Sequence, residues 1–180
     1  MIGRITELVK RAFLRRERVG GLRFARSADY DARRGGEPGD ETLTRLTIKA
    51  GPYVFGARME TALAPKTCES FLSRLPFESQ VVHVRWSGEA VWIPLGDMNF
   101  NVGYENNTSY PAPGQIILYP GGLSETEILI GYGGVRFASK VGQLSGSHFL
   151  TIDEGIENIA DLGKMTLWKG AQPIRFELAE

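Results

Sequence analysis

Short apolar segments with a period of two constrain the fold more than any other feature of this 180-residue chain. Leu46 and Ile48 alternate with polar residues, and a Gly51-Pro52 turn leads into a second such segment at 53–59. This alternation is typical of half-buried β-strands, and the turn between the two segments predicts a hairpin. Further strands are predicted at 80–86, 90–95, 115–119, 127–132, 148–152 and 173–178. Short, regularly spaced strands of this kind predict a mainly β fold, a closed antiparallel β-barrel.

Two helices interrupt the strands. Pro65 suits the first turn of a helix over 65–75, since the donor that proline lacks would be unpaired there anyway. An apolar stripe follows at i, i+3, i+4 and i+7, formed by Cys68, Phe71, Leu72 and Leu75. A second helix is predicted over 153–162, with Asp153 as its N-cap. Amphipathic helices of this kind are expected to cap the open ends of the barrel.

The N-terminal part has a different composition. Residues 1–36 contain ten of the 21 basic residues but only four of the 21 acidic ones. The apolar residues Ile2, Ile5, Val9 and Phe13 have helical spacing, which is consistent either with a basic amphipathic helix for a membrane surface or acidic partner, or with a dispensable leader. We therefore predict a basic tail and linker over 1–41 and a barrel domain over 42–180.

Composition argues against several classes of function. The net charge is zero, which removes the usual electrostatic argument for a nucleic-acid partner. A single cysteine, Cys68, allows no intramolecular disulfide, and no apolar run reaches the length of a membrane span or resembles a secretory signal. Two histidines without further ligands at suitable spacing predict no metal site. We expect a cytoplasmic protein without a cofactor and without an integral membrane segment.

Three motifs resemble cyclophilins, in the order in which cyclophilins carry them. Residues 64–71 (APKTCESF) resemble the segment that opens the first cyclophilin helix, 144–150 (LSGSHFL) a turn leading into a strand, and 153–159 (DEGIENI) the start of the second helix. Segments 75–79, 86–89 and 114–122 resemble a smaller bacterial group of cyclophilin-like proteins of unknown function more closely. The resemblance covers 42–180 and implies a barrel of about eight strands with a helix at each open end.

The resemblance also implies site residues. Cyclophilins place an arginine beside the substrate proline, and a histidine belongs to the same site; Arg85 and His148 are the matching candidates for catalysis. Four further residues are candidates for ligand binding. The strand pattern puts His83 on the same face as Arg85, Leu129 and Gln143 stand near positions where cyclophilins have aromatic residues, and Arg136 adjoins Phe137.

Three hypotheses for function follow. The first is a binding or accessory barrel that holds a small polar molecule or a peptide segment over Arg85 and His148. The second is a peptidyl-prolyl cis-trans isomerase of reduced or altered specificity, in which a guanidinium weakens the amide conjugation at proline. The third is a homo-oligomer whose groove is covered by a neighbouring subunit through the apolar region 132–137.

Overall fold

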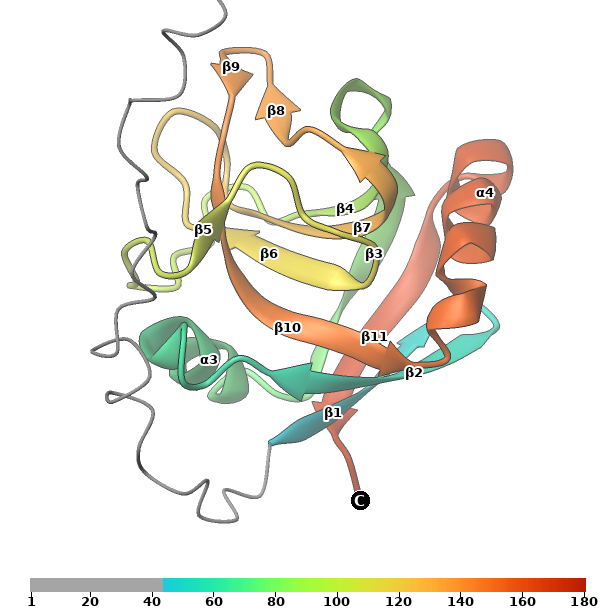
Figure 1. The fold of residues 1–180 in the computed structure, drawn as a ribbon, viewed down its shortest axis with the longest axis horizontal. Helices are drawn as coiled ribbons and strands as arrows, with labels where there is room; N and C mark the ends of the chain where they lie inside the picture. The colour runs from blue at the N-terminus through green and yellow to red at the C-terminus, as the bar shows by residue number, and fades with distance from the viewer. Residues whose placement is uncertain (1–43) are drawn as a thin grey trace, which may run out of the picture. The chain divides into compact units, whose positions relative to one another are not determined.

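The structure is a computed structural model that describes residues 44–180, so the predicted tail and linker at 1–41 lie outside the described residues. Eight strands, each antiparallel to its neighbours, close into a barrel (Figure 1). In order around the barrel they are β2 (Tyr53–Met59), β1 (Arg45–Ala50), β11 (Gln172–Leu178), β3 (Phe77–His83), β4 (Gly88–Pro94), β7 (Glu127–Val135), β6 (Gln115–Tyr119) and β10 (Gly146–Glu154), which pairs again with β2. The predicted fold class is confirmed.

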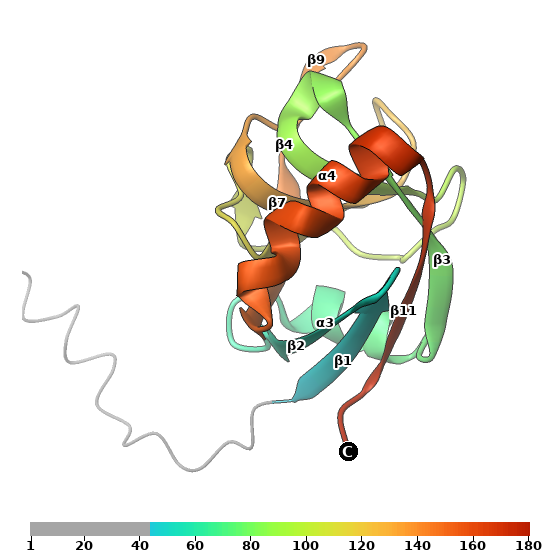
Figure 2. The same ribbon diagram turned by 90° about the vertical axis from the view of Figure 1, so that its right-hand side faces the viewer.

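Three two-residue strands lie outside the closed barrel. β5 (Asn107–Thr108) pairs with the start of β10, while β8 (Ala138–Ser139) and β9 (Gly142–Gln143) form a small hairpin of their own. A single 3-10 turn, η1 (Arg85–Ser87), separates β3 from β4. In both ribbon views this turn and the β8–β9 hairpin lie at the same end of the molecule (Figures 1 and 2).

The barrel interior is filled by the alternating apolar residues of the strands together with one face of the first helix. Ile128 and Ile130 of β7 belong to this core, whereas Leu129 between them belongs to a second, smaller cluster. Since neighbouring side chains in a strand point to opposite faces, the second cluster lies on the outer face of the barrel. β4 and β6 follow the same rule, so three adjacent strands present apolar side chains on both faces.

The first helix, α3 (Pro65–Leu72), has Pro65 at its first turn as predicted and is shorter at its C-terminal end. Its Phe71 meets a ring of aromatic side chains in the core, with Phe149 and Phe176 at centroid distances of 5.0 and 5.3 Å. No side chain of α3 caps its N-terminus. Instead, Glu105 accepts hydrogen bonds from the Thr67 N–H and hydroxyl, both at 2.9 Å. The long loop between β4 and β6 is therefore tied to the helix.

The second helix differs from the prediction. The chain stays in β10 as far as Glu154, turns at Gly155 (φ 72°), forms the 3-10 turn η2 (Ile156–Asn158) and only then enters α4 (Ile159–Lys169). A side chain at Gly155 would meet the Val54 carbonyl oxygen at 2.8 Å, so the turn there needs glycine. Asp153 is not a helix cap, because it is in a strand and pairs with Arg45 at 2.7 Å. α4 lies across one side of the barrel (Figure 2).

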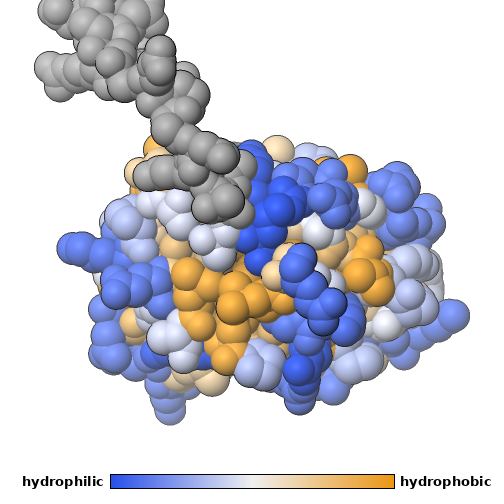
Figure 3. All heavy atoms as spheres, turned by 90° about the horizontal axis from the view of Figure 1, so that it is seen from below, coloured by the Kyte–Doolittle hydropathy of each residue, from blue (hydrophilic) through white to orange (hydrophobic). Residues whose placement is uncertain are grey.

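The far end of the barrel carries an apolar patch bordered by hydrophilic side chains (Figure 3). This is the end where α3 and β1 lie in Figure 1, opposite to the β8–β9 hairpin. Leu63 before α3 and Leu178 at the end of β11 are more than half exposed. Within residues 44–180, no helix is long and apolar enough to cross a membrane.

Candidate functional site

The outer apolar cluster supports the candidate site. It consists of Val84, Ala90, Ile117, Tyr119, Leu129, Phe137 and Leu144, with Trp92 and Val135 packed against them. Leu129, one of the predicted ligand-binding residues, is fully buried in this cluster. Its contribution is therefore to hold the surrounding elements in place.

Three hydrogen bonds connect η1 to the segment around β8. The Arg136 N–H donates to the Ser87 carbonyl at 3.0 Å, and the Ser87 hydroxyl both donates to and accepts from the backbone of Ala138. A fourth hydrogen bond ties the loop before β6 to the same segment, since the Phe137 N–H donates to the Ser109 carbonyl at 2.8 Å. Three segments that are far apart in the sequence thus meet, and their side chains form one surface.

We call this region the junction surface and define it by Arg85, Trp86, Tyr110, Arg136 and Gln143. The Trp86 ring is 60 % exposed, and its neighbour Trp92 packs edge to face against it at a centroid distance of 5.7 Å. Tyr110 is 61 % exposed. The Gln143 carboxamide oxygen accepts hydrogen bonds from Arg136 Nε at 3.2 Å and from the Tyr110 hydroxyl at 3.4 Å. Two predicted residues, Arg136 and Gln143, are in contact here, and a third, Arg85, lies in η1, whose Ser87 is hydrogen-bonded to the same segment.

His83 lies on a different side. β3 ends at His83 and Arg85 belongs to the turn that follows, so the two residues do not share the face of one strand, contrary to the prediction. His83 Nε2 lies 2.6 Å from the Tyr132 hydroxyl, and its Nδ1 is buried without a hydrogen-bond partner among the described residues. Burial, and second the charge of Arg85, lower the pKa of His83. Tyr132 packs against Gly163 of α4, which places the pair beneath that helix.

His148 is part of another polar network. Its side chain is 12 % exposed, and its Nε2 lies 2.9 Å from the hydroxyl of Thr151. That hydroxyl donates to Glu60 at 2.5 Å, so it accepts its other hydrogen bond from His148. Burial lowers the pKa of His148, against the opposing charge of Glu60. The side chain of Asn106 donates to the His148 carbonyl at 2.9 Å and so fixes the long loop to β10.

Arg85 and His148 do not border one site. His148 stands opposite Ile117, Ile117 opposite Leu129, and Leu129 opposite Trp92. Three strand spacings of about 4.8 Å separate the backbones of His148 and Trp92 by about 14 Å. Arg85 lies beyond the start of β4, further from His148 still. The predicted pairing of these two residues in one pocket is therefore not observed.

Sequence reasoning did not select Glu127, the most unusual carboxyl group of the outer face. Glu127 is 4 % exposed, and burial together with the nearby Glu125 raises its pKa to about 7. The Trp92 indole N–H lies close enough to oppose this rise, yet it has no hydrogen bond of acceptable geometry within residues 44–180. The only sequence signal was the position of Glu127, two residues before Leu129, which puts both on one face of β7.

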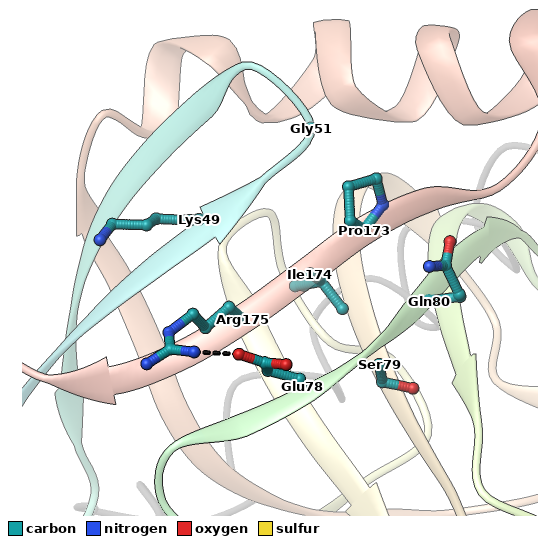
Figure 4. Close-up of a pocket in the computed structure, with 8 residues that line it drawn as sticks. All are labelled: Lys49, Gly51, Glu78, Ser79, Gln80, Pro173, Ile174 and Arg175. Carbon is teal, nitrogen blue, oxygen red and sulfur yellow. Dashed lines mark hydrogen bonds and ion pairs between the residues drawn. The ribbon is translucent and has the colours of Figure 1, made fainter.

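Two depressions lie away from the predicted residues. One, of about 550 Å³, lies over β1, β3 and β11, where Arg175 pairs with Glu78 across the two strands (Figure 4). The other, of about 300 Å³, lies between 96–99 and 120–126. In the part of the chain that the structure describes, no group of three His, Cys, Asp or Glu side chains is arranged to hold a metal ion.

Two solved structures illustrate how far the fold is shared with other proteins. McbB, solved in complex with tryptophan, has a TM-score of 0.57 and 16 % identity over 73 % of this chain, which spans 44 % of McbB. A cyclophilin-type peptidyl-prolyl cis-trans isomerase from Cryptosporidium parvum has a TM-score of 0.52 and 12 % identity, over 77 % of this chain and 98 % of that one. At these identities the similarity concerns the fold alone.

Comparison with curated proteins finds no match. A family model does match, and it covers residues 46–178, which is nearly the whole described part of the chain. The family is described as "Protein of unknown function (DUF3830)". The chain belongs to this family, a group of proteins of unknown function, and its barrel is cyclophilin-like.

Proposed function

We propose that the protein is a binding barrel that holds a small polar molecule or a peptide segment on the junction surface. The observation that carries this proposal is the exposed Trp86 ring, which packs on Trp92 in a surface that also contains two arginines, Arg85 and Arg136. Tryptophan and arginine are enriched among the residues that dominate binding energy at interfaces. A tryptophan left 60 % exposed on a partly buried support is therefore a candidate anchor for a ligand.

Hydrogen bonds within the protein also hold parts of the surface together in the absence of a ligand. Ser87 is buried and hydrogen-bonded on both sides to the backbone of Ala138, and Gln143 holds the side chains of Arg136 and Tyr110. A ligand that binds to groups already held in place loses less free energy in ordering them. These hydrogen bonds therefore favour binding of a ligand without a rearrangement of the surface.

The test is a fragment and short-peptide screen by NMR on the full chain, followed by binding measurements on Trp86→Ala. We expect ligands to shift the Trp86 indole and the amides of Arg136 and Gln143, and we expect Trp86→Ala to abolish these shifts. Trp168→Ala is the matched control, because Trp168 is 80 % exposed but lies on α4. Ligands that bind elsewhere and are indifferent to Trp86→Ala would rule out the proposal.

The isomerase hypothesis stays a prediction. It would require Arg85 to act without His148, since the two lie on separated parts of the barrel. We expect a protease-coupled assay with a proline peptide to show no rate above background. A rate that is present in the wild type and lost in Arg85→Ala would instead favour the isomerase.

The oligomer hypothesis has less support than the sequence suggested. Phe137 is fully buried in the outer cluster, and Tyr132 packs against α4, so both aromatic residues are used within the described part of the chain. Light scattering tests the hypothesis directly, and we expect the mass of a monomer.

A further inference from the structure

The charges of the junction surface differ from those of the rest of the barrel. Residues 44–180 contain 14 acidic and 11 basic side chains, and five of the basic ones form ion pairs within this range. Arg85, Arg136 and the neighbouring Lys140 form none with the described residues. Three of the six basic side chains without ion pairs in the described range therefore belong to η1 and the segment around β8, in a domain that is otherwise mildly acidic.

Glu89, an acidic residue of the adjoining strand, does not neutralise them. Its carboxylate accepts a hydrogen bond from the Gly134 N–H at 2.7 Å and lies against Gly133. Among the ion pairs of residues 44–180, none joins it to Arg85 or Arg136. The charge of Arg85 also contributes to the lowered pKa of His83, as expected for a guanidinium without a counter-ion.

Several hydrogen-bond donors of the surface are unused. The Gln143 oxygen already accepts two hydrogen bonds, and the carbonyls of Ser87, Ser109 and Ala138 each accept one. The terminal nitrogens of Arg136, the guanidinium of Arg85 and the Gln143 amide nitrogen donate none within residues 44–180. These unused donors favour a ligand that supplies acceptors.

We propose that the junction surface recognises a carboxylate on a ligand that also carries a planar apolar group. This rests on the proposed function, because it names the chemistry of the ligand for the same surface. Arginine forms charge-assisted, often bidentate hydrogen bonds with carboxylates, and its planar group as well as exposed Trp86 and Tyr110 accept flat partners by stacking. A neutral ligand would use the rings and leave both guanidiniums without an ionic partner.

The experiment compares three probes of nearly equal shape: N-acetyl-tryptophan, N-acetyl-tryptophanamide and tryptamine, which are anionic, neutral and cationic. Each is titrated into the full chain at low salt while the indole, arginine Nε and backbone resonances are followed by NMR. We expect the anion to bind about tenfold more tightly than the neutral amide, as one charge-assisted contact would provide, and tryptamine to bind most weakly. Added salt should reduce the affinity of the anion relative to that of the neutral amide.

Variants separate the inference from the proposed function. Arg136→Gln should remove about tenfold of the affinity for N-acetyl-tryptophan and clearly less of that for the amide, with Lys169→Gln as the control at the end of α4. Circular dichroism confirms that each variant is folded, and Arg85→Gln provides a second variant in another segment. Equal affinity for acid and amide, with both lost in Trp86→Ala, would overturn the carboxylate inference and keep the proposed function. Binding of neither probe at the junction surface would overturn both.

Discussion

Ionisation of Glu127 should make the protein less stable as the pH rises, and Glu127→Gln should remove this loss. Burial and Glu125 raise the pKa of Glu127 from 4.5 to about 7. Because the pKa of Glu127 is higher in the folded than in the unfolded state, the protonated carboxyl contributes to the free energy of unfolding. This contribution is complete below pH 4.5 and is lost as the pH rises through about 7. The whole separation corresponds to about 3 kcal/mol, most of which is expressed between about pH 5 and pH 8.5.

The assay is urea unfolding of both proteins across this pH range. The wild type should lose roughly 2–3 kcal/mol relative to Glu127→Gln between the two ends of the pH range. His83 and His148 have lowered pKa values, so they destabilise the folded state as the pH falls below about 6.5, in the opposite direction. Both histidines are present in both proteins, and their effect cancels in the difference. Parallel curves for the two proteins would refute the reasoning.

Glu125→Gln provides a control for the cause. Removing the Glu125 charge should lower the pKa of Glu127 and so reduce the loss of unfolding free energy at high pH. Part of the loss should remain, because the Glu127 carboxyl is still buried. A loss that is unchanged in Glu125→Gln would mean that burial alone determines the pKa.

Three further variants or reagents test the packing. Glu105→Ala should cost about 1–2 kcal/mol in urea unfolding, because α3 loses the hydrogen bonds that cap it; unchanged stability would contradict this role. Gly163→Ala should destabilise by about 1 kcal/mol or more, since the new Cβ would lie 2.4 Å from the Tyr132 ring, and a gain of stability, the usual result in a helix interior, would argue against this packing. Cys68 should resist a thiol reagent in the folded protein, because burial raises the pKa of its thiol to about 12; rapid labelling would show that the site opens.

The barrel could be predicted because its signal is local. Alternating apolar residues or short apolar runs identified all eight barrel strands within a few residues, and Pro65 marked the first turn of α3. The errors arose at the ends of elements, where tertiary contacts decide whether the chain continues as a strand. Asp153 suits a helix cap, but β10 continues through it and its side chain pairs with Arg45. The strand period likewise continued past His83 in the sequence although the chain turns there.

The candidate site was predictable only in part. Resemblance to cyclophilins selected Arg85 and Gln143, and their proximity to Arg136 depends on hydrogen bonds between η1 and the segment around β8 that no local pattern shows. Nothing in the sequence shows how much of Trp86 is exposed, and only the fold reveals it. Likewise, nothing in the sequence distinguishes Glu127 from an ordinary strand-end carboxylate, because its pKa results from burial by other segments.

A crystal structure of the protein with bound N-acetyl-tryptophan tests the central claim most directly. We predict that the ligand's indole packs on Trp86 and that its carboxylate lies within hydrogen-bonding distance of Arg136 or Arg85. A ligand seated instead in the depression beside Lys49 and Arg175, or on the apolar patch near α3, would contradict the assignment of the junction surface as the binding site.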